Sequence, residues 1–262
     1  MNSFPTVSIL VTHYNRSRSL EALLKSFEEI ECNFAQIVVS DDGSQYEHLN
    51  YLKTLQSRYS FHLVTTPSNK GLGNNINKGQ DVIDTPYTLY VQEDFVPTSF
   101  FPKKLHTAIS FMDEDPELDI VRFYSYLEYP YMTPFKKGFS YMNFNVYGIK
   151  YSKLFYYSDH PHLRRTSFFD KFGRYQEGLK VEQTEYKMCV SFIQNNGKGL
   201  FYNDYQRLFI QKNSTEEPST VRRNAWRRGN NYFVSKVRNV YRQIKYNYDI
   251  SVSPIIGKRQ LK

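Results

Sequence analysis

Two adjacent carboxylic acids, Glu93 and Asp94, directly follow a run of strand-forming residues from Tyr87 to Val91. A short apolar run bounded by turn residues is typical of a buried strand, and a parallel sheet buries both faces of such a strand. The two acids would then stand at the carboxyl end of the strand, where open α/β sheets bind ligands. Adjacent anions repel each other, and a hard cation such as Mg²⁺ offsets that repulsion. The pair is therefore either a metal site or a solvated acidic turn.

Three more polar clusters have the same position, each directly after a predicted strand. They contain Thr12 and Tyr14, then Asp41 and Asp42, then Asn69, Lys70 and Gly71. Each cluster alone is also ordinary turn chemistry. Because a doubly wound sheet gathers the carboxyl ends of its strands in one crevice, we expect all four clusters to lie on one rim.

The chemistry of this rim matches a nucleotide that carries phosphates. The ring of Tyr14 can stack on a base, and Asp41 or Asp42 can accept a hydrogen bond from a base N–H or a ribose hydroxyl. Lys70 and the amides at the start of the following helix can meet a phosphate. Asp94 can hold a metal ion that bridges two phosphates.

The elements that must position these residues alternate regularly along the first half of the chain. Strands are predicted over residues 7–12, 36–40, 61–65, 87–91 and 119–125, and helices over 19–30, 46–57, 73–84 and 101–115. This alternation predicts βαβ units in a parallel, doubly wound sheet. Residues 126–162 have no clear period. A helix is predicted at 184–195, with short strands near 199–202 and 207–211.

Charge divides the chain into two parts. Residues 218–262 hold eleven Lys or Arg and one acid, whereas residues 1–217 hold 23 basic and 25 acidic residues. Residues 213–220 indicate a linker, and from 221 to 245 apolar positions keep near-helical spacing between the cations. Such an amphipathic helix either lies on an anionic membrane or packs on the preceding domain. Nucleic-acid binding would depend on this tail alone and is not expected.

Two cysteines, Cys32 and Cys189, are too few for a disulfide framework or a metal cluster. The first residues lack the basic start and long apolar run of a signal peptide. No apolar run approaches the roughly 18 residues of a membrane span. We therefore expect a cytoplasmic protein, either free or held peripherally at the inner face of the membrane.

Four segments, VSILVTHYNR, IVVSDDGS, NKGLGNNINKG and LYVQEDF, resemble in order and spacing the nucleotide-sugar-binding half of inverting family 2 glycosyltransferases. The resemblance covers about residues 5–125 well. It implies the GT-A fold, an α/β fold with a Rossmann-like, mostly parallel sheet and helices on both faces, here followed by a C-terminal amphipathic helical tail. The implied division is a GT-A domain over 1–217, with donor binding in 5–125 and acceptor binding and catalysis in 126–217, and a basic helical tail over 218–262.

The resemblance also implies roles on the rim. These are base contacts from Thr12 and Tyr14, uracil or ribose contacts from Asp41 or Asp42, ribose-diphosphate contacts from Asn69, Lys70 and Gly71, and a DxD-like metal site at Glu93 and Asp94. The family often has three acids at this last site, and this chain has Gln92 before the pair. Asp94 is therefore the expected ligand of the metal, Mg²⁺ or Mn²⁺.

The second half resembles the family more faintly. The segment FFDKFGRYQEGLKVEQTEYKMCVSFIQNNG is similar to the one that holds the catalytic base, usually a Glu-Asp pair at the start of a helix. Here the pair is Glu182 and Gln183, and an amide cannot take a proton at neutral pH. Glu182 is the first candidate for the base and Glu185 the second; otherwise the alignment of this segment is shifted or activity is lost. The helix dipole alone also favours acids there. A further polar cluster with Asp159 and His160 is the candidate acceptor contact.

The implied function is that of an inverting glycosyltransferase of the hexosyl or hexosaminyl type. A sugar would pass from a UDP-linked donor to a glycan or lipid-linked acceptor, as in polysaccharide biosynthesis for the cell envelope, with a metal ion and a carboxylate base. Two other classes stay open, a nucleotide-sugar-binding protein that has lost its base and a nucleotidyltransferase. A dinucleotide fingerprint at 71–73 is disfavoured because Ile76 replaces its third glycine. The sugar, the acceptor, the linkage and the oligomeric state stay open.

Overall fold

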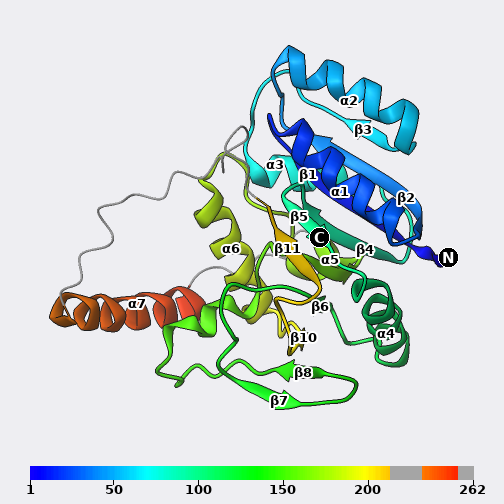
Figure 1. Cartoon of the computed structure of the whole chain (residues 1–262). Helices are drawn as coiled ribbons and strands as arrows, with labels where there is room; N and C mark the ends of the chain where they lie inside the picture. The colour runs from blue at the N-terminus through cyan, green and yellow to red at the C-terminus, as the bar shows by residue number, and fades with distance from the viewer. Residues whose placement is uncertain (213–231, 253–262) are drawn as a thin grey trace.

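A nine-stranded sheet with helices on both faces forms the body of the molecule (Figure 1). The computed structural model describes residues 1–212 and 232–252. Strands of this sheet stand in the order β3-β2-β1-β4-β9-β6-β10-β8-β7, and a second sheet pairs β5 with β11. The predicted α/β architecture is confirmed.

The bounds of the elements follow the predicted alternation through α4. The strands are β1 (Asn2–His13), β2 (Cys32–Asp41), β3 (His62–Val64), β4 (Tyr87–Gln92), β5 (Phe95–Pro97), β6 (Ile120–Arg122), β7 (Met132–Pro134), β8 (Phe139–Met142), β9 (His162–Arg165), β10 (Gly199–Tyr202) and β11 (Phe209–Gln211). The helices are α1 (Ser17–Glu29), α2 (Tyr46–Tyr59), α3 (Leu72–Gln80), α4 (Phe101–Glu114), the 3₁₀ helix η1 (Tyr151–Tyr156), α5 (Phe168–Phe172), α6 (Val181–Gln194) and α7 (Tyr232–Val252).

Side chains of β1 alternate between two hydrophobic cores. Ile9 and Val11 pack in the core on one face of the sheet, and Leu10 packs in the core on the other face. Successive residues of a strand point to opposite faces, so a strand covered on both sides is apolar throughout. Helices α1, α2 and α4 complete the first core, and α3, α5 and α6 complete the second. Polar residues are therefore left to the strand ends.

Strand β9 enters the sheet antiparallel between β4 and β6, and the sequence pattern does not predict it. Its sequence, HLRR, carries charges that are unusual in a central strand. Arg164 is nevertheless fully buried, because its Nη2 donates to Gln80 Oε1 at 2.7 Å and its guanidinium lies 5.2 Å from the ring centre of Phe168. Hydrogen bonds from both Nη atoms and the surrounding aromatic rings hold this charge in the core, while its Nε is buried without a hydrogen-bond partner.

The helix predicted in the tail is present as α7, which packs against α6 and η1. The predicted linker at 213–220 and residues 221–231 lie outside the described part of the chain. Among the residues that the structure describes, no helix has both the length and the apolar character that crossing a membrane requires.

Candidate active site

The carboxyl ends of β1, β2 and β4 form one edge of the large sheet. β1 runs parallel to both neighbours, with His13 opposite Asp41 and Thr12 opposite Gln92. The loop after β3 reaches the same edge, because the Thr65 hydroxyl donates to Asp41 Oδ2 at 2.9 Å. The polar clusters after these strands therefore lie on one rim.

The carboxylate of Asp41 is buried and bonded to groups of the protein itself. Its Oδ1 pairs with His13 Nδ1 at 2.8 Å and accepts from the Ser44 hydroxyl, while Oδ2 accepts the amides of Gly43 and Ser44 at 3.1 Å. Burial alone would raise the pKa of Asp41, but the hydrogen bonds from His13 and Ser44 outweigh it and lower the pKa to about 2. Asp41 therefore orders the turn after β2.

Asp42 holds the loop that precedes α3. Its Oδ1 accepts the Lys70 amide at 2.8 Å, and its Oδ2 accepts the Gly71 amide at 2.9 Å. Burial raises the pKa of Asp42, and these two hydrogen bonds act against the rise. Gly43 has a φ of +68°, and a Cβ added there would lie 2.5 Å from the backbone carbon of Ser68. Only glycine allows the two loops to pack this closely.

The N-terminus of α3 carries exposed polar groups and Lys70, and a second lysine, Lys78, stands in the last turn of the helix. Asn69 and Lys70 are exposed, and Gly71 begins the helix with a φ of +88°. Lys78 is half-buried on α3, and burial lowers its pKa to about 8 against the attraction of Asp42. Amides and cations at a helix N-terminus are the composition of a phosphate site.

The segment between α5 and α6 lies over this N-terminus. Glu177 accepts hydrogen bonds from Asn74 Nδ2 at 2.8 Å and from Asn77 Nδ2 at 2.9 Å. A Cβ added at Gly73 would lie 2.4 Å from the carbonyl oxygen of Gln176, so the two backbones touch. This contact brings the start of α6 to the rim.

The acid pair after β4 is buried and shares one arginine. Nη1 of Arg16 lies 3.2 Å from Glu93 Oε1 and 3.3 Å from Asp94 Oδ2. Gln211 on β11 also donates to Asp94 Oδ2, at 2.8 Å. Burial and the charge of Asp94 raise the pKa of Glu93, while Arg16 acts in the opposite direction. With both acids ionised the three groups would keep a net negative charge.

The second carboxylate oxygen of Asp94, Oδ1, is buried and has no hydrogen-bond partner. Such an atom is costly unless a ligand meets it. A hard divalent cation fits, because it binds carboxylate oxygen and completes its shell with phosphate and water. Within the described residues no group of three or more His, Cys, Asp or Glu could hold a metal ion. Phosphate or water oxygens would therefore supply the remaining ligands.

Thr12 and Tyr14 differ in their exposure. Thr12 is buried at the end of β1, with its hydroxyl 3.1 Å from the hydroxyl of Tyr90. Tyr14 is half-buried in the turn between β1 and α1. The next residue, Asn15, joins this turn to the one after β2, since its amide donates to Ser44 Oγ at 2.8 Å.

A second acid pair lies where α6 meets the segment before β9. The Asp159 amide donates to Glu185 Oε1 at 3.0 Å, and Asp159 Oδ1 accepts from Tyr157 at 3.1 Å and Tyr175 at 2.8 Å. Burial and the charge of Glu185 raise the pKa of Asp159 against those two bonds. Asp159 Oδ2 is buried without a hydrogen-bond partner. Glu182, in the first turn of α6, is exposed.

Aromatic rings connect the two acid pairs. The ring centre of His160 lies 5.9 Å from that of Phe95, which follows Asp94, and 4.6 Å from that of Tyr126. The Tyr126 hydroxyl donates to Gln211 Oε1 at 2.6 Å, and Gln211 is the partner of Asp94. Burial lowers the pKa of His160 to about 3, so its ring is neutral. These side chains thus form a continuous link between the acid pair after β4 and the second acid pair.

The profile of the family described as glycosyl transferase family 2 matches residues 8–173, which is more than half of the chain. The chain belongs to this family. It is a family 2 glycosyltransferase. The matched region holds the four rim clusters and ends before α6.

A cholesterol galactosyltransferase of Borreliella burgdorferi is 24% identical to this glycosyltransferase over 222 residues. The aligned region covers 77% of this chain and 60% of that protein. The glycosyltransferase thus spans less than two thirds of the length of that relative.

Two solved structures resemble the glycosyltransferase in fold. S. aureus TarS 1-349 in complex with UDP-GlcNAc has a TM-score of 0.61 and 15% identity, covering 93% of this chain and 73% of that one. The mannosyltransferase PcManGT of Pyrobaculum calidifontis in complex with GDP-Man and Mn²⁺ has a TM-score of 0.58 and 11% identity, covering 96% and 66%. At these identities the likeness concerns the fold, and it confirms the GT-A prediction.

Sequence reasoning missed several residues of the site in this glycosyltransferase. Arg16 stands in the first motif, and its position one turn after a strand end was the available signal. Lys78 likewise stands in the third motif. Gln211 reaches Asp94 only because β11 pairs antiparallel with β5, which no local pattern reveals. Tyr175 lies in an irregular segment and carries no signal.

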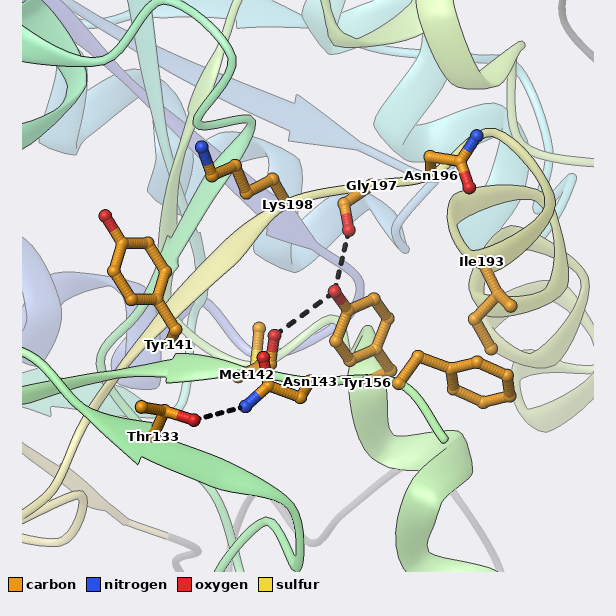
Figure 2. A pocket seen from close by; sticks show the side chains of 10 residues that line it. Thr133, Tyr141, Met142, Asn143, Tyr156, Ile193, Asn196, Gly197 and Lys198 are labelled. Carbon is orange, nitrogen blue, oxygen red and sulfur yellow. Dashed lines mark hydrogen bonds between the residues drawn. The ribbon is translucent and has the colours of Figure 1, made fainter. Parts of the chain in front are cut away.

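A cavity of about 730 Å³, shown in Figure 2, lies beside β8 and the start of β10. Its lining includes Asn143 after β8, Tyr156 of η1, and Lys198 before β10. The Tyr156 hydroxyl donates to the carbonyl oxygen of Gly197 at 2.7 Å. Because β10 runs parallel to β6, the residues before β10 are at the amino edge, away from both acid pairs. The cavity is therefore not part of the candidate active site.

Proposed function

We propose that the protein transfers a sugar from a UDP-linked donor to a glycan or lipid-linked acceptor, with inversion at the anomeric carbon. The observation that carries the proposal is the continuous site with two unpaired buried carboxylate oxygens, Asp94 Oδ1 on the rim and Asp159 Oδ2 beside Glu185. Residues 1–217 would form the catalytic domain, with donor binding in 5–125 and acceptor binding in 126–217.

The donor would lie along the rim. Tyr14 would stack on the uracil, and Asp41 or Asp42 would read the base or the ribose; both carboxylates are held in place by hydrogen bonds from the protein itself. Thr12 would support the base site from the end of β1. The solved structures with UDP-GlcNAc and UDP support a uridine nucleotide, while the one with GDP-Man marks guanosine as the alternative.

The diphosphate would meet the N-terminus of α3 and a divalent cation. Asn69, Lys70 and the Gly71 backbone would lie beside it, because helix N-termini attract phosphate. Asp94 would hold Mg²⁺ or Mn²⁺ through Oδ1, with Glu93 next to it. When bound, the ion would offset negative charge on the departing nucleoside diphosphate. The Mn²⁺ in the mannosyltransferase structure supports this choice of metal.

The second acid pair would supply the general base. A carboxylate takes the proton of the acceptor hydroxyl, the oxygen of that hydroxyl forms a bond to the anomeric carbon, and the bond from that carbon to the β-phosphate oxygen breaks. Glu185 is favoured over Glu182, because Glu185 contacts Asp159 while Glu182 is exposed in the first turn of α6. His160 and Asp159 would contact the acceptor. One displacement inverts the configuration.

The acceptor class is supported by the relative named a cholesterol galactosyltransferase, whose name describes hexose transfer to a lipid. A protein that binds donor without transferring it is the second candidate, because Gln183 stands where the family's base usually stands. This second candidate predicts that the rim binds the donor but that no sugar is transferred.

Turnover of UDP-sugars with Mn²⁺ or Mg²⁺ tests the proposal. An enzyme releases UDP slowly without acceptor and faster with one, whereas a binding protein releases none at equal donor occupancy. Glu185→Gln is expected to lose transfer while calorimetry shows unchanged UDP affinity, because the base acts in the transition state. Glu182→Gln is the matched control. If Glu182→Gln loses sugar transfer and Glu185→Gln keeps full activity, the base is Glu182, one helical turn earlier.

A further inference from the structure

One side of α7 is fixed to the catalytic body. The ring of Tyr246 lies 5.3 Å from that of Tyr186 on α6, centre to centre. The fully buried Lys153 of η1 donates from Nζ to Asn247 Oδ1 at 2.9 Å. These contacts set the rotation of the helix about its axis, so its other side must face outward.

That other side is apolar and aromatic. Its exposed side chains, with their exposed fractions, are Val240 (59%), Tyr241 (63%), Ile244 (66%), Tyr248 (63%) and Val252 (57%). At 3.6 residues per turn these five positions fall within an arc of about 120° and span about 18 Å along the axis. Exposed apolar side chains gathered on one face mark an interaction site.

A neighbouring loop extends this face. Tyr147 and Ile149 are 89% and 88% exposed, and the Ile149 carbonyl oxygen accepts a hydrogen bond from Gln243 of α7 at 2.5 Å. The loop therefore lies against the helix. We call the five helix residues together with Tyr147 and Ile149 the outer patch.

Two lysines border the outer patch. Lys150 is exposed beside Ile149, and Lys245 lies next to the exposed face of α7, where it is ion-paired with Asp249 at 2.7 Å. Asp249, the acid of the helix, also accepts a hydrogen bond from Tyr186 at 2.6 Å on the side that faces the body. In the sequence, residues 218–262 hold eleven Lys or Arg and this single acid. A partner that accepts apolar side chains and carries negative charge fits this composition.

We propose that the outer patch binds an anionic membrane surface. Aliphatic side chains and tyrosines would enter the headgroup region shallowly, with the cations near lipid phosphates. A second copy of the chain would bring two basic faces together, which like-charge repulsion opposes. The structure therefore favours the lipid surface over self-association.

Docking through the outer patch would orient the enzyme toward its acceptor. Tyr186, which contacts α7, is the residue after Glu185. Glu185 of the second acid pair is thus adjacent in the sequence to a residue that contacts the helix proposed to lie on the bilayer. This orientation rests on the proposed function, whereas lipid binding by the outer patch does not depend on it.

Sedimentation of the full chain with vesicles tests the proposal. The vesicles are phosphatidylcholine alone, or with about one third phosphatidylglycerol, at low and high salt. The expected result is binding to the anionic vesicles that weakens with salt. The combined substitutions Tyr241→Ser, Ile244→Ser and Tyr248→Ser should weaken it by about tenfold or more, because three inserted side chains are lost.

The matched control is the pair Tyr46→Ser and Phe100→Ser, whose side chains are 79% and 49% exposed away from α7 and should not change the binding. Deletion of the tail is a poor test, because it would uncover the Lys153 and Tyr186 contacts. Normal vesicle binding by the triple variant would overturn the proposal. So would a wild-type protein that stays in the supernatant at low salt, or that forms a dimer lost in the triple variant without binding lipid. UDP binding by every variant shows that the donor site is intact.

Discussion

Asp94 is the residue on which the proposed metal binding depends, since its Oδ1 is buried and unpaired while Oδ2 is held by Arg16 and Gln211. Asp94→Asn is expected to lower metal-dependent turnover on the order of 10²–10³-fold, because an amide oxygen offers a divalent cation less charge. Rates measured across a Mn²⁺ titration, with Mn²⁺ binding followed by calorimetry, check this. Asp204→Asn, an exposed acid, is the control. Rates near normal at equal Mn²⁺ would remove Asp94 from the metal site.

We expect Lys78 to give donor binding a pH dependence. Burial lowers its pKa to about 8, so the side chain loses its positive charge as the pH rises through that value. If Lys78 attracts the donor phosphates, UDP affinity falls above about pH 8, and Lys78→Gln is weaker at neutral pH and independent of pH in this range. Calorimetric titration with UDP at several pH values measures both. Lys70→Gln, an exposed neighbour, should keep the pH dependence. An unchanged profile in Lys78→Gln would contradict the assignment.

Residue identities on the rim were predictable from the sequence, because each cluster directly follows a strand whose apolar run is easy to recognise. The separate structural roles of these residues were not predictable from the sequence. Asp41 and Asp42 are adjacent in the sequence, yet one bonds to His13 and the other to the amides before α3. That distinction depends on which loop each carboxylate meets in three dimensions.

The contact between α3 and the segment before α6 sets the shape of the proposed phosphate site at the N-terminus of α3. Gly73→Ala would place a methyl group 2.4 Å from the Gln176 carbonyl oxygen, and this oxygen belongs to backbone that must move. We expect a loss of about 1–3 kcal/mol in the free energy of unfolding, together with weaker UDP binding. Urea unfolding and calorimetry measure the two effects. In Gly178→Ala the added Cβ meets nothing within 4 Å, so this variant reports backbone strain without the collision. Gly73 itself has no left-handed backbone, so a Gly73→Ala variant with the wild-type free energy of unfolding and UDP affinity would rule out the collision.

Elements with a strong hydrophobic period were predicted from the sequence, and elements fixed by distant partners were not. Helix α1 follows the spacing of Leu20, Leu23, Leu24 and Phe27, all buried on one face. Strand β9 is defined instead by its place between β4 and β6, and the buried Arg164 depends on Gln80 from α3. Local patterns carry no record of such partners.

Because burial and the charge of Asp94 raise the pKa of Glu93, the free energy of unfolding of the whole molecule should depend on pH. A carboxyl whose pKa is raised binds its proton more tightly in the folded chain, so the free energy of unfolding falls as the pH rises from the ordinary value of 4.5 through the raised one. Without metal, Glu93→Gln should therefore gain stability relative to the wild type on the order of 1–3 kcal/mol between about pH 5 and pH 8.

Thermal unfolding in the presence of a chelator measures this difference. Glu117→Gln is the control, because the Glu117 side chain is 85% exposed. Asp159 contributes a slope of the same sign, so Glu93→Gln should reduce the dependence without removing it. Parallel curves for Glu93→Gln and the wild type would show that Arg16 keeps Glu93 ionised throughout.

The position of β9 has a consequence for the nascent chain. Strands β1 to β4 can pair as they leave the ribosome, but β6 pairs only with β9 and β10, which are synthesised much later. Until β9 arrives, β4 presents an open edge with unpaired amides and carbonyls, the kind of edge that invites pairing with other chains. The yield of folded enzyme should therefore increase with slow translation or with chaperones that cover the open edge of the incomplete sheet.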